Sequence, residues 1–235
     1  MMVYYDLHIH TCLSPCASDD MTPNNIVNMA LLKGLDVIAV TDHNSALNVE
    51  AVYRIGRKKG LIVVPGIEVQ TKEEVHVLCY FYSVEECIKF SEIISKNMTK
   101  IKNNKTIFGN QIVMDEKDRE IGEMEELLLV SSNFTISEIF QYMEGRGAAV
   151  PAHVNRGSYS IISNLGFIPN IKNLSTIEIS KSTDKKVFLK EHPECKKYRI
   201  ISSSDAHHLG YISEREEFLP CDLSLKSIVD WLCGC

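Results

Sequence analysis

The chain has 235 residues, of which 45% are hydrophobic and 24% charged, a balance typical of one globular domain over residues 1–235. Its net charge of −6 argues against duplex nucleic acid as a partner, whereas a small anionic substrate fits if bound cations set the local field. The sequence shows no signal peptide, no paired CxxC motif and no apolar run near the roughly 20 residues of a membrane span. We therefore expect a cytoplasmic protein with reduced cysteines and no membrane contact.

Strand-like and helix-like segments alternate along most of the chain. The first strand covers 3–7, and Thr22 and Pro23 then predict a helix start, because a cap residue is followed by proline at the first helical position. Further strands are predicted at 36–40, 61–64, 75–81, 148–151, 176–179 and 199–202. Further helices are predicted at 49–59, 85–102, 135–144 and 223–232. The charged, irregular stretch 106–130 suggests a lid within a helical excursion over about 85–135.

Seven strands interleaved with helices fit either a closed barrel or an open doubly wound sheet. An open sheet would gather its ligands at one switch point, and the sequence has no Gly-rich phosphate loop for this purpose. Instead, a histidine or a carboxylate follows almost every strand, and only a barrel brings all strand ends to one axis. The sequence therefore predicts a distorted (β/α)7 TIM-like barrel.

The polar residues at these strand ends are typical of a metal site. His8 and His10 are two residues apart in a strand, so their imidazoles point to the same side. Gly66 is expected to let the backbone turn so that the Glu68 carboxylate points inward. The set is too large for one tetrahedral ion, and mixed nitrogen and oxygen donors suit Zn, Mn or Fe(II). We therefore predict two to three divalent ions that share bridging carboxylates, with Glu68 as the best bridge.

The motifs that carry these residues are DLHIHT, TDHN, GIEV, VHVLCY, PAHVNR and SDAHHL, in this order. Together they resemble the PHP (polymerase and histidinol phosphatase) family, whose members have a distorted seven-stranded barrel with a trinuclear metal site and usually hydrolyse phosphate esters. The resemblance implies metal ligands at His8, His10, His43, Glu68, His76, His153, Asp205 and His207. A further ligand from the first loop is assigned to Asp20, with Asp19 and Cys16 as alternatives.

Four other residues have two interpretations each. Asp42 either touches a metal or accepts a hydrogen bond from a ligand imidazole, and Glu178 is either a ligand or a buried support. Arg156 matches an arginine that clamps phosphate in family phosphatases, or it forms a surface ion pair. His208 is either a general acid or a packing residue. We expect Arg156, His208 and Asp42 to form the catalytic set.

The expected function is that of a phosphoesterase in which a metal-activated hydroxide attacks a small phosphomonoester, such as a nucleoside monophosphate or histidinol phosphate. The alternatives are a nuclease or cyclic-nucleotide phosphodiesterase of the same family, and a non-catalytic metal-binding regulatory module. An amidohydrolase-type barrel would also begin with His-x-His, but it requires a bridging lysine that the sequence lacks.

Overall fold

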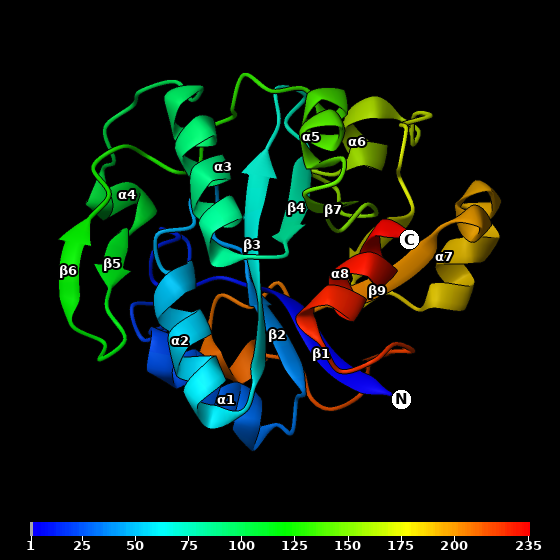
Figure 1. The fold of residues 1–235 in the computed structure, drawn as a ribbon. Helices are drawn as coiled ribbons and strands as arrows, with labels where there is room; N and C mark the ends of the chain where they lie inside the picture. Colours follow the sequence, from blue (N-terminus) through cyan, green and yellow to red (C-terminus); the bar gives the residue numbers. More distant parts are fainter. Residues whose placement is uncertain (1) are drawn as a thin grey trace.

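The computed structural model describes residues 2–235 (Figure 1). Its strands are β1 (Val3–Ile9), β2 (Val37–Val40), β3 (Ile62–Gln70), β4 (His76–Phe81), β5 (Ile112–Met114), β6 (Glu120–Glu123), β7 (Gly147–Pro151), β8 (Thr176–Ser180), β9 (Arg199–Ser203) and β10 (Phe218–Leu219). Its α-helices are α1 (Pro23–Leu32), α2 (Val49–Lys59), α3 (Val84–Lys96), α4 (Lys105–Phe108), α5 (Ile136–Met143), α6 (Ile161–Leu165), α7 (Lys185–Glu191) and α8 (Leu225–Cys233). None of the helices in this part of the chain is long and apolar enough to cross a membrane.

The seven predicted strands correspond to β1, β2, β3, β4, β7, β8 and β9, which follow one another around a distorted barrel. Hydrogen-bonded ladders join β1 through β4 to β7, and a separate parallel ladder joins β8 to β9. Single contacts close the two seams: the Val154 N–H donates to the Glu178 carbonyl at 2.8 Å, and Ile9 bridges to Ala206. The predicted barrel fold is therefore confirmed.

One barrel strand runs against the others. β4 is antiparallel to both β3 and β7, whereas β1, β2 and β3 are mutually parallel. The connection from Gln70 to His76 is a short turn, and a parallel crossover needs a dozen or more residues, so β4 can only run back along β3. As a result, the start of β4 lies at the barrel end where the parallel strands finish.

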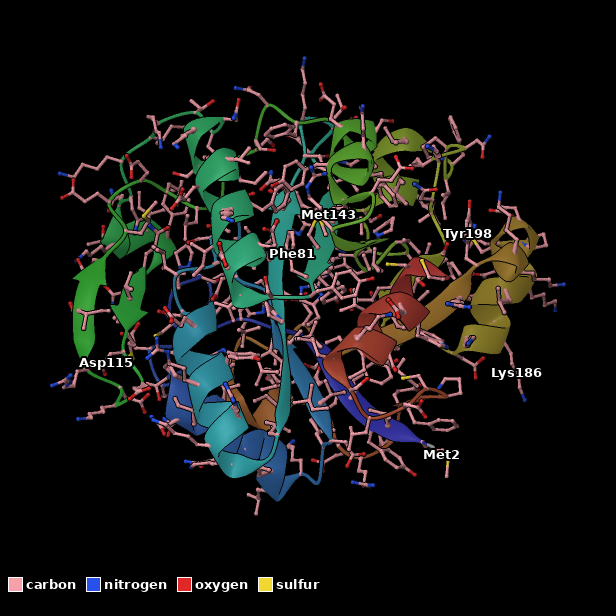
Figure 2. All side chains as sticks on the ribbon, viewed as in Figure 1. Met2, Phe81, Asp115, Met143, Lys186 and Tyr198 are labelled. Carbon is pink, nitrogen blue, oxygen red and sulfur yellow. The ribbon has the colours of Figure 1, made fainter. Side chains whose placement is uncertain are left out.

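The other end of the barrel is filled by α8. Ile228, Val229 and Leu232 of this helix belong to one apolar cluster with the inward residues of the strands, among them Tyr5 and Tyr80. Hydrogen bonds also join α8 to the amino ends of three strands: Cys233 donates to the Gly147 carbonyl of β7, and carbonyls of the helix accept from Thr176 of β8 and Arg199 of β9. A second cluster fills the space between the strands and the outer helices; it includes Phe81 at the end of β4 and Met143 at the end of α5, both labelled in Figure 2.

The helix predictions are close, and the main difference lies after α3. The predicted start at Thr22 and Pro23 is observed, with the Thr22 hydroxyl capping the Asn25 N–H. The helix predicted over 85–102 ends at Lys96, and Met98 instead bridges to Ser132. The stretch 106–130 contains the β5–β6 hairpin, which lies at the edge of the molecule beside α4 (Figure 1).

Gly66 has a different role from the predicted one. It lies inside β3, paired with Tyr80, and its φ is not positive, so the chain does not turn there. A Cβ at this position would lie 2.8 Å from Thr41 Cγ2, closer than real Cβ contacts. Glycine is therefore needed for close strand packing, and β3 continues to Gln70 rather than ending at the predicted residue 64.

Candidate metal centre

The strand ends opposite α8 bring the eight ligands expected from the sequence to one place. β1 carries His8, and its ladder with β2 shifts register between Asp6 and Ile9. Such irregularities re-aim side chains near functional sites, and here the Nε2 atoms of His8 and His10 approach to 3.3 Å. The other expected ligands follow or lie on neighbouring strands: His43 after β2, Glu68 on β3, His76 on β4, His153 after β7, and Asp205 and His207 after β9.

Glu68 stands at the middle of this group and is only 1% exposed. Its two oxygens face different imidazoles, which is the geometry expected of a carboxylate that bridges two cations. The Oε1 atom lies 2.9 Å from His76 Nδ1, 3.2 Å from His8 Nε2 and 3.4 Å from His153 Nε2. The Oε2 atom lies 2.9 Å from His43 Nδ1 and 3.5 Å from His10 Nε2.

These short contacts do not have the angles of hydrogen bonds. Both Glu68 oxygens, both ring nitrogens of His76 and of His153, and Nδ1 of His43 are buried without a hydrogen-bond partner. Buried polar atoms are costly unless they are bonded, and carboxylate and imidazole atoms that converge in this way are suited to surround cations. The residues therefore fit a metal centre. Three sets of donor atoms lie within 4.8 Å of one another: His10, His43 and His207; His8, His10 and Glu68; and His43, Glu68 and His76.

Hydrogen bonds on the far side of three rings direct Nε2 towards this centre. His8 Nδ1 lies 3.0 Å from Glu178 Oε2, which also accepts the His153 N–H at 3.0 Å. His10 Nδ1 lies 2.9 Å from Ser14 Oγ, and His207 Nδ1 lies 2.8 Å from the carbonyl oxygen of Asp205. A ring that donates through Nδ1 keeps Nε2 free as a metal ligand. Glu178 thus acts as a buried support, one of its two expected roles.

Asp42 is hydrogen-bonded to the residues beside the ligand imidazoles rather than to an imidazole. Its carboxylate accepts hydrogen bonds from Thr11 N, Thr11 Oγ1 and Ser14 Oγ, each at 2.7 Å. Since Ser14 donates to Asp42, its oxygen can accept the proton on His10 Nδ1. Sequence reasoning assigned no role to Thr11 or Ser14, although both lie in or beside the first motif.

The two carboxylates of the centre have pKa values that suit cation binding. Burial raises the pKa of Glu68, but the surrounding imidazoles of His76, His8 and His43 outweigh it and hold that pKa well below its usual range. The pKa of Asp205 is lowered in the same way by His8 and His10, against burial. Burial lowers the pKa of His10 and of His76, which favours neutral rings, whereas nearby carboxylates, Glu178 at His8 and Glu68 at His43, outweigh burial and raise the pKa of these two rings.

The first loop does not bring the expected Asp20 to the imidazoles. Asp20 and Asp19 are both exposed; the Asp20 carbonyl accepts from Asn25, and the Asp19 carboxylate accepts from Asn110. None of the three candidates from this loop, Asp20, Asp19 and Cys16, belongs to the donor sets found among residues 2–235. Burial raises the pKa of the Cys16 thiol, but the influence of the His207 and His43 imidazoles outweighs burial and brings that pKa to about 7.

A cavity of about 220 Å3 opens onto the centre. Arg156 lines it, with Nη2 2.7 Å from Asp205 Oδ2, and so does Tyr159, whose ring stacks on His76 at 4.9 Å and 16°. Tyr159 is 45% exposed and has a φ of 53°, which is strained for an aromatic residue. Sequence reasoning missed it, because no local pattern marks this loop position. His208 is exposed, contacts Tyr211 edge-on and does not line the cavity.

Comparison with known proteins identifies the family. A family model described as the PHP domain matches residues 6–210. The chain belongs to this family. Membership confirms the predicted family.

The relatives of this PHP-domain chain include nucleases. The 5'-3' exoribonuclease Rnm of Salmonella typhimurium is 33% identical over 82 residues, which are 32% of this chain and 27% of that enzyme. The endonuclease Q of Pyrococcus furiosus, specific for DNA lesions, has a TM-score of 0.68 at 21% identity, and the match covers 100% of this chain and 56% of that one. A two-domain Bacteroides vulgatus protein with a PHP-like metal-dependent phosphoesterase has a TM-score of 0.57 at 15% identity, covering 100% and 63%. The chain thus spans only part of these proteins.

The prediction that excluded duplex nucleic acid is wrong. An endonuclease Q structure with the same fold (TM-score 0.65, 21% identity, covering 100% of this chain and 57% of that one) holds a 27-mer duplex with an abasic lesion at its active site. The argument from net charge fails because an average over the whole chain does not describe the field at one site. Bound cations and the Arg156 guanidinium beside the cavity would set that local field.

Proposed function

We propose that this PHP-domain chain hydrolyses phosphodiester bonds in nucleic acid at a centre of two to three divalent cations, Zn, Mn or Fe(II). This proposal replaces the phosphomonoester that the sequence favoured first. The observation that carries it is the set of imidazoles around the buried Glu68 carboxylate. The cavity above this set is lined by the guanidinium of Arg156 and by the exposed ring of Tyr159. The exoribonuclease and endonuclease Q relatives support the choice of substrate.

Each part of the site has a distinct task in this reaction. The bound cations would lower the pKa of water and offset the charge of the phosphoryl oxygens. Glu68 holds the imidazole sets together, and Glu178 keeps His8 in the required tautomer.

Arg156 offers its guanidinium to the phosphate. A planar guanidinium can bind two phosphoryl oxygens at once, and the ion pair with Asp205 directs it towards the cavity. The side chain is 47% exposed, so it can release Asp205 and turn to a substrate at little cost.

Tyr159 offers a stacking surface to a nucleobase. One face of its ring lies on His76, and the residue remains 45% exposed at the rim of the cavity. Stacking of a base on an aromatic ring contributes about 1–3 kcal/mol and tolerates any base. A base beside the scissile phosphate would favour a polynucleotide over a simple phosphomonoester.

The test is a comparison of substrates on the metal-loaded chain. Labelled single-stranded RNA and DNA, duplex DNA with and without an abasic site, and p-nitrophenyl phosphate are incubated with Mn or Zn. We expect cleavage of at least one polynucleotide at a rate well above that of the monoester. The double variant H8A/D205N should be inactive, whereas H192A, which changes a half-buried histidine in contact with Phe188 and Glu194, should behave like the wild type.

Two results would overturn the proposal. Polynucleotide cleavage that persists in H8A/D205N would show that the activity arises elsewhere. Full metal occupancy without turnover of any phosphodiester would instead indicate a non-catalytic metal-binding module.

A further inference from the structure

Two cysteines separated by one glycine lie where α8 ends, at the end of the barrel opposite the metal centre (Figure 1). Cys233 is the last residue of the helix, Gly234 caps it, and Cys235 follows. The Cys233 thiol donates to the Gly147 carbonyl of β7 at 3.1 Å, and the Cys235 N–H donates to the Asp230 carbonyl at 3.0 Å. Both cysteines are therefore held in place by hydrogen bonds.

Gly234 brings the two cysteines within reach of a disulfide bond. Its φ of 82° and ψ of 18° are left-handed helical values, so the Cα atoms on either side of it have the helical separation of about 5.5 Å. Disulfide-bonded cysteines most often have Cα atoms about 5.5–6 Å apart. A Cβ at Gly234 would lie 2.5 Å from Ser175 Oγ, so the packing requires glycine at this turn.

Both cysteines line one cavity. Its volume is about 390 Å3, and its other walls come from the end of α5, from β7 and from the segment before β8. A pocket of roughly 300–1,000 Å3 is large enough for a small-molecule ligand. Cys235 is exposed, whereas Cys233 is half-buried, and burial raises the pKa of the Cys233 thiol. A small reagent therefore meets Cys235 first, with Cys233 behind it in the same cavity.

We propose that Cys233 and Cys235 form a dithiol site that reduces low-molecular-weight disulfides and closes a reversible disulfide bond between its own sulfurs. The Cys235 thiolate attacks one sulfur of the small disulfide, whose S–S bond breaks, and the other half leaves as a thiol after taking up a proton. Cys233 then gives its proton to water, and its thiolate attacks the Cys235 sulfur of the mixed disulfide. This releases the second half, which is also protonated to a thiol.

The reaction balances without a further reactant. The protein dithiol loses two electrons and two protons, and one small disulfide becomes two thiols. The new ring contains only three residues and departs from a relaxed disulfide geometry, so we expect excess thiol to reopen it. The site lies at the opposite end of the barrel from Glu68 and His8, and this inference does not rest on the proposed function.

Glutathione is the probe, and the metal-loaded chain is equilibrated with mixtures of its oxidised and reduced forms. The samples are quenched with acid, alkylated, digested with trypsin and mapped by mass spectrometry. Cleavage after Lys226 leaves Cys233 and Cys235 in one peptide and Cys221 in another. We expect the first peptide to lose two hydrogens in oxidised glutathione and to regain them in reduced glutathione. Cys221 is the internal control, because it is half-buried like Cys233 but does not line the cavity, and it should remain open to alkylation.

Three variants test the order of the two steps. C233S should accumulate a mixed disulfide of glutathione with Cys235, to about tenfold or more the wild-type level, because no neighbouring thiol displaces the glutathione. C235S should form neither the ring nor a comparable amount of adduct at the half-buried Cys233. C221S is the matched control and should close the ring as the wild type does. Circular dichroism of each variant checks that the fold is retained.

Three results would refute the dithiol site. The first is a peptide that keeps both thiols free at every glutathione ratio. The second is a wild-type chain that stops at the mixed disulfide, and the third is a disulfide that links two chains instead of closing within one. Polynucleotide cleavage measured on the same samples reports on the proposed function alone, so the two proposals can fail independently.

Discussion

Replacing Glu178 with alanine tests whether a buried carboxylate, and not the cations alone, holds the metal-binding imidazoles in place. Glu178 is 2% exposed, and a single oxygen, Oε2, accepts from His8 Nδ1 and from the His153 N–H, both at 3.0 Å. The alanine variant leaves both buried donors without a partner. Removing the carboxylate therefore affects folding in the metal-free protein and metal affinity in the loaded one.

The size of each effect follows from these two contacts. A hydrogen bond to a charged group contributes about 1.5–3 kcal/mol, so E178A should destabilise the metal-free protein by about 3–6 kcal/mol. In a chain of this length, 1 kcal/mol shifts the Tm by about 2–4 °C, which predicts a fall of roughly 6–24 °C. Loss of an outer-shell partner lowers metal affinity by about 10–100-fold. E178Q keeps an amide oxygen as acceptor and should lose about half the stability that E178A loses.

The assay combines thermal unfolding of the metal-free protein with zinc titration against a competing chelator. Thr176→Val is the matched control on the same strand: Thr176 Oγ1 donates to the Leu232 carbonyl at 2.7 Å, away from the metal centre. It should cost about 1 kcal/mol and leave zinc affinity unchanged. If E178A binds zinc within twofold of the wild type, or unfolds at the same temperature as T176V, the reasoning about the support is refuted.

Four further predictions follow from the site and the fold. Tyr159→Ala should raise the KM for an oligonucleotide roughly 5–150-fold, because about 1–3 kcal/mol of base stacking is lost, while Y159F keeps a KM near that of the wild type. A kinetic assay that gives Y159A the KM of the wild type would contradict base stacking. Arg156→Ala should lower kcat about 10²-fold with unchanged metal content by elemental analysis, whereas lost metal would mean that the arginine is structural. Gly147→Ala would drive a Cβ into the Tyr80 carbonyl and should cost about 3 kcal/mol of folding stability or prevent folding. G122A is the control, because a Cβ at Gly122 meets no neighbouring atom. Denaturation of G147A at the wild-type midpoint would contradict this close packing. Chelation of metals present at about 100 times their Kd should lower the free energy of unfolding by about 2.7 kcal/mol and therefore the Tm by roughly 5–11 °C, measured by calorimetry. An unchanged Tm would contradict coupling of metal binding to folding.

The sequence by itself determined the barrel and the set of side chains that gather at one end of its strands. The apolar runs mark the strands, and a histidine or acid at each strand end needs only the strand direction to be placed. This is why His8, His10 and Glu68, far apart in the chain, could be assigned to one centre before any coordinates were considered.

Only the tertiary structure decided which neighbours these residues have. The contact from Glu178 to His8 spans 170 residues, and the stacking of Tyr159 on His76 depends on a strained loop, so no local pattern predicts either one. The first loop offers Cys16, Asp19 and Asp20 within five residues, and the tertiary structure leaves both aspartates exposed, with the Asp19 carboxylate bonded to Asn110. Patterning fixes the side of a strand on which a residue lies, whereas distances between loops depend on how the whole chain packs.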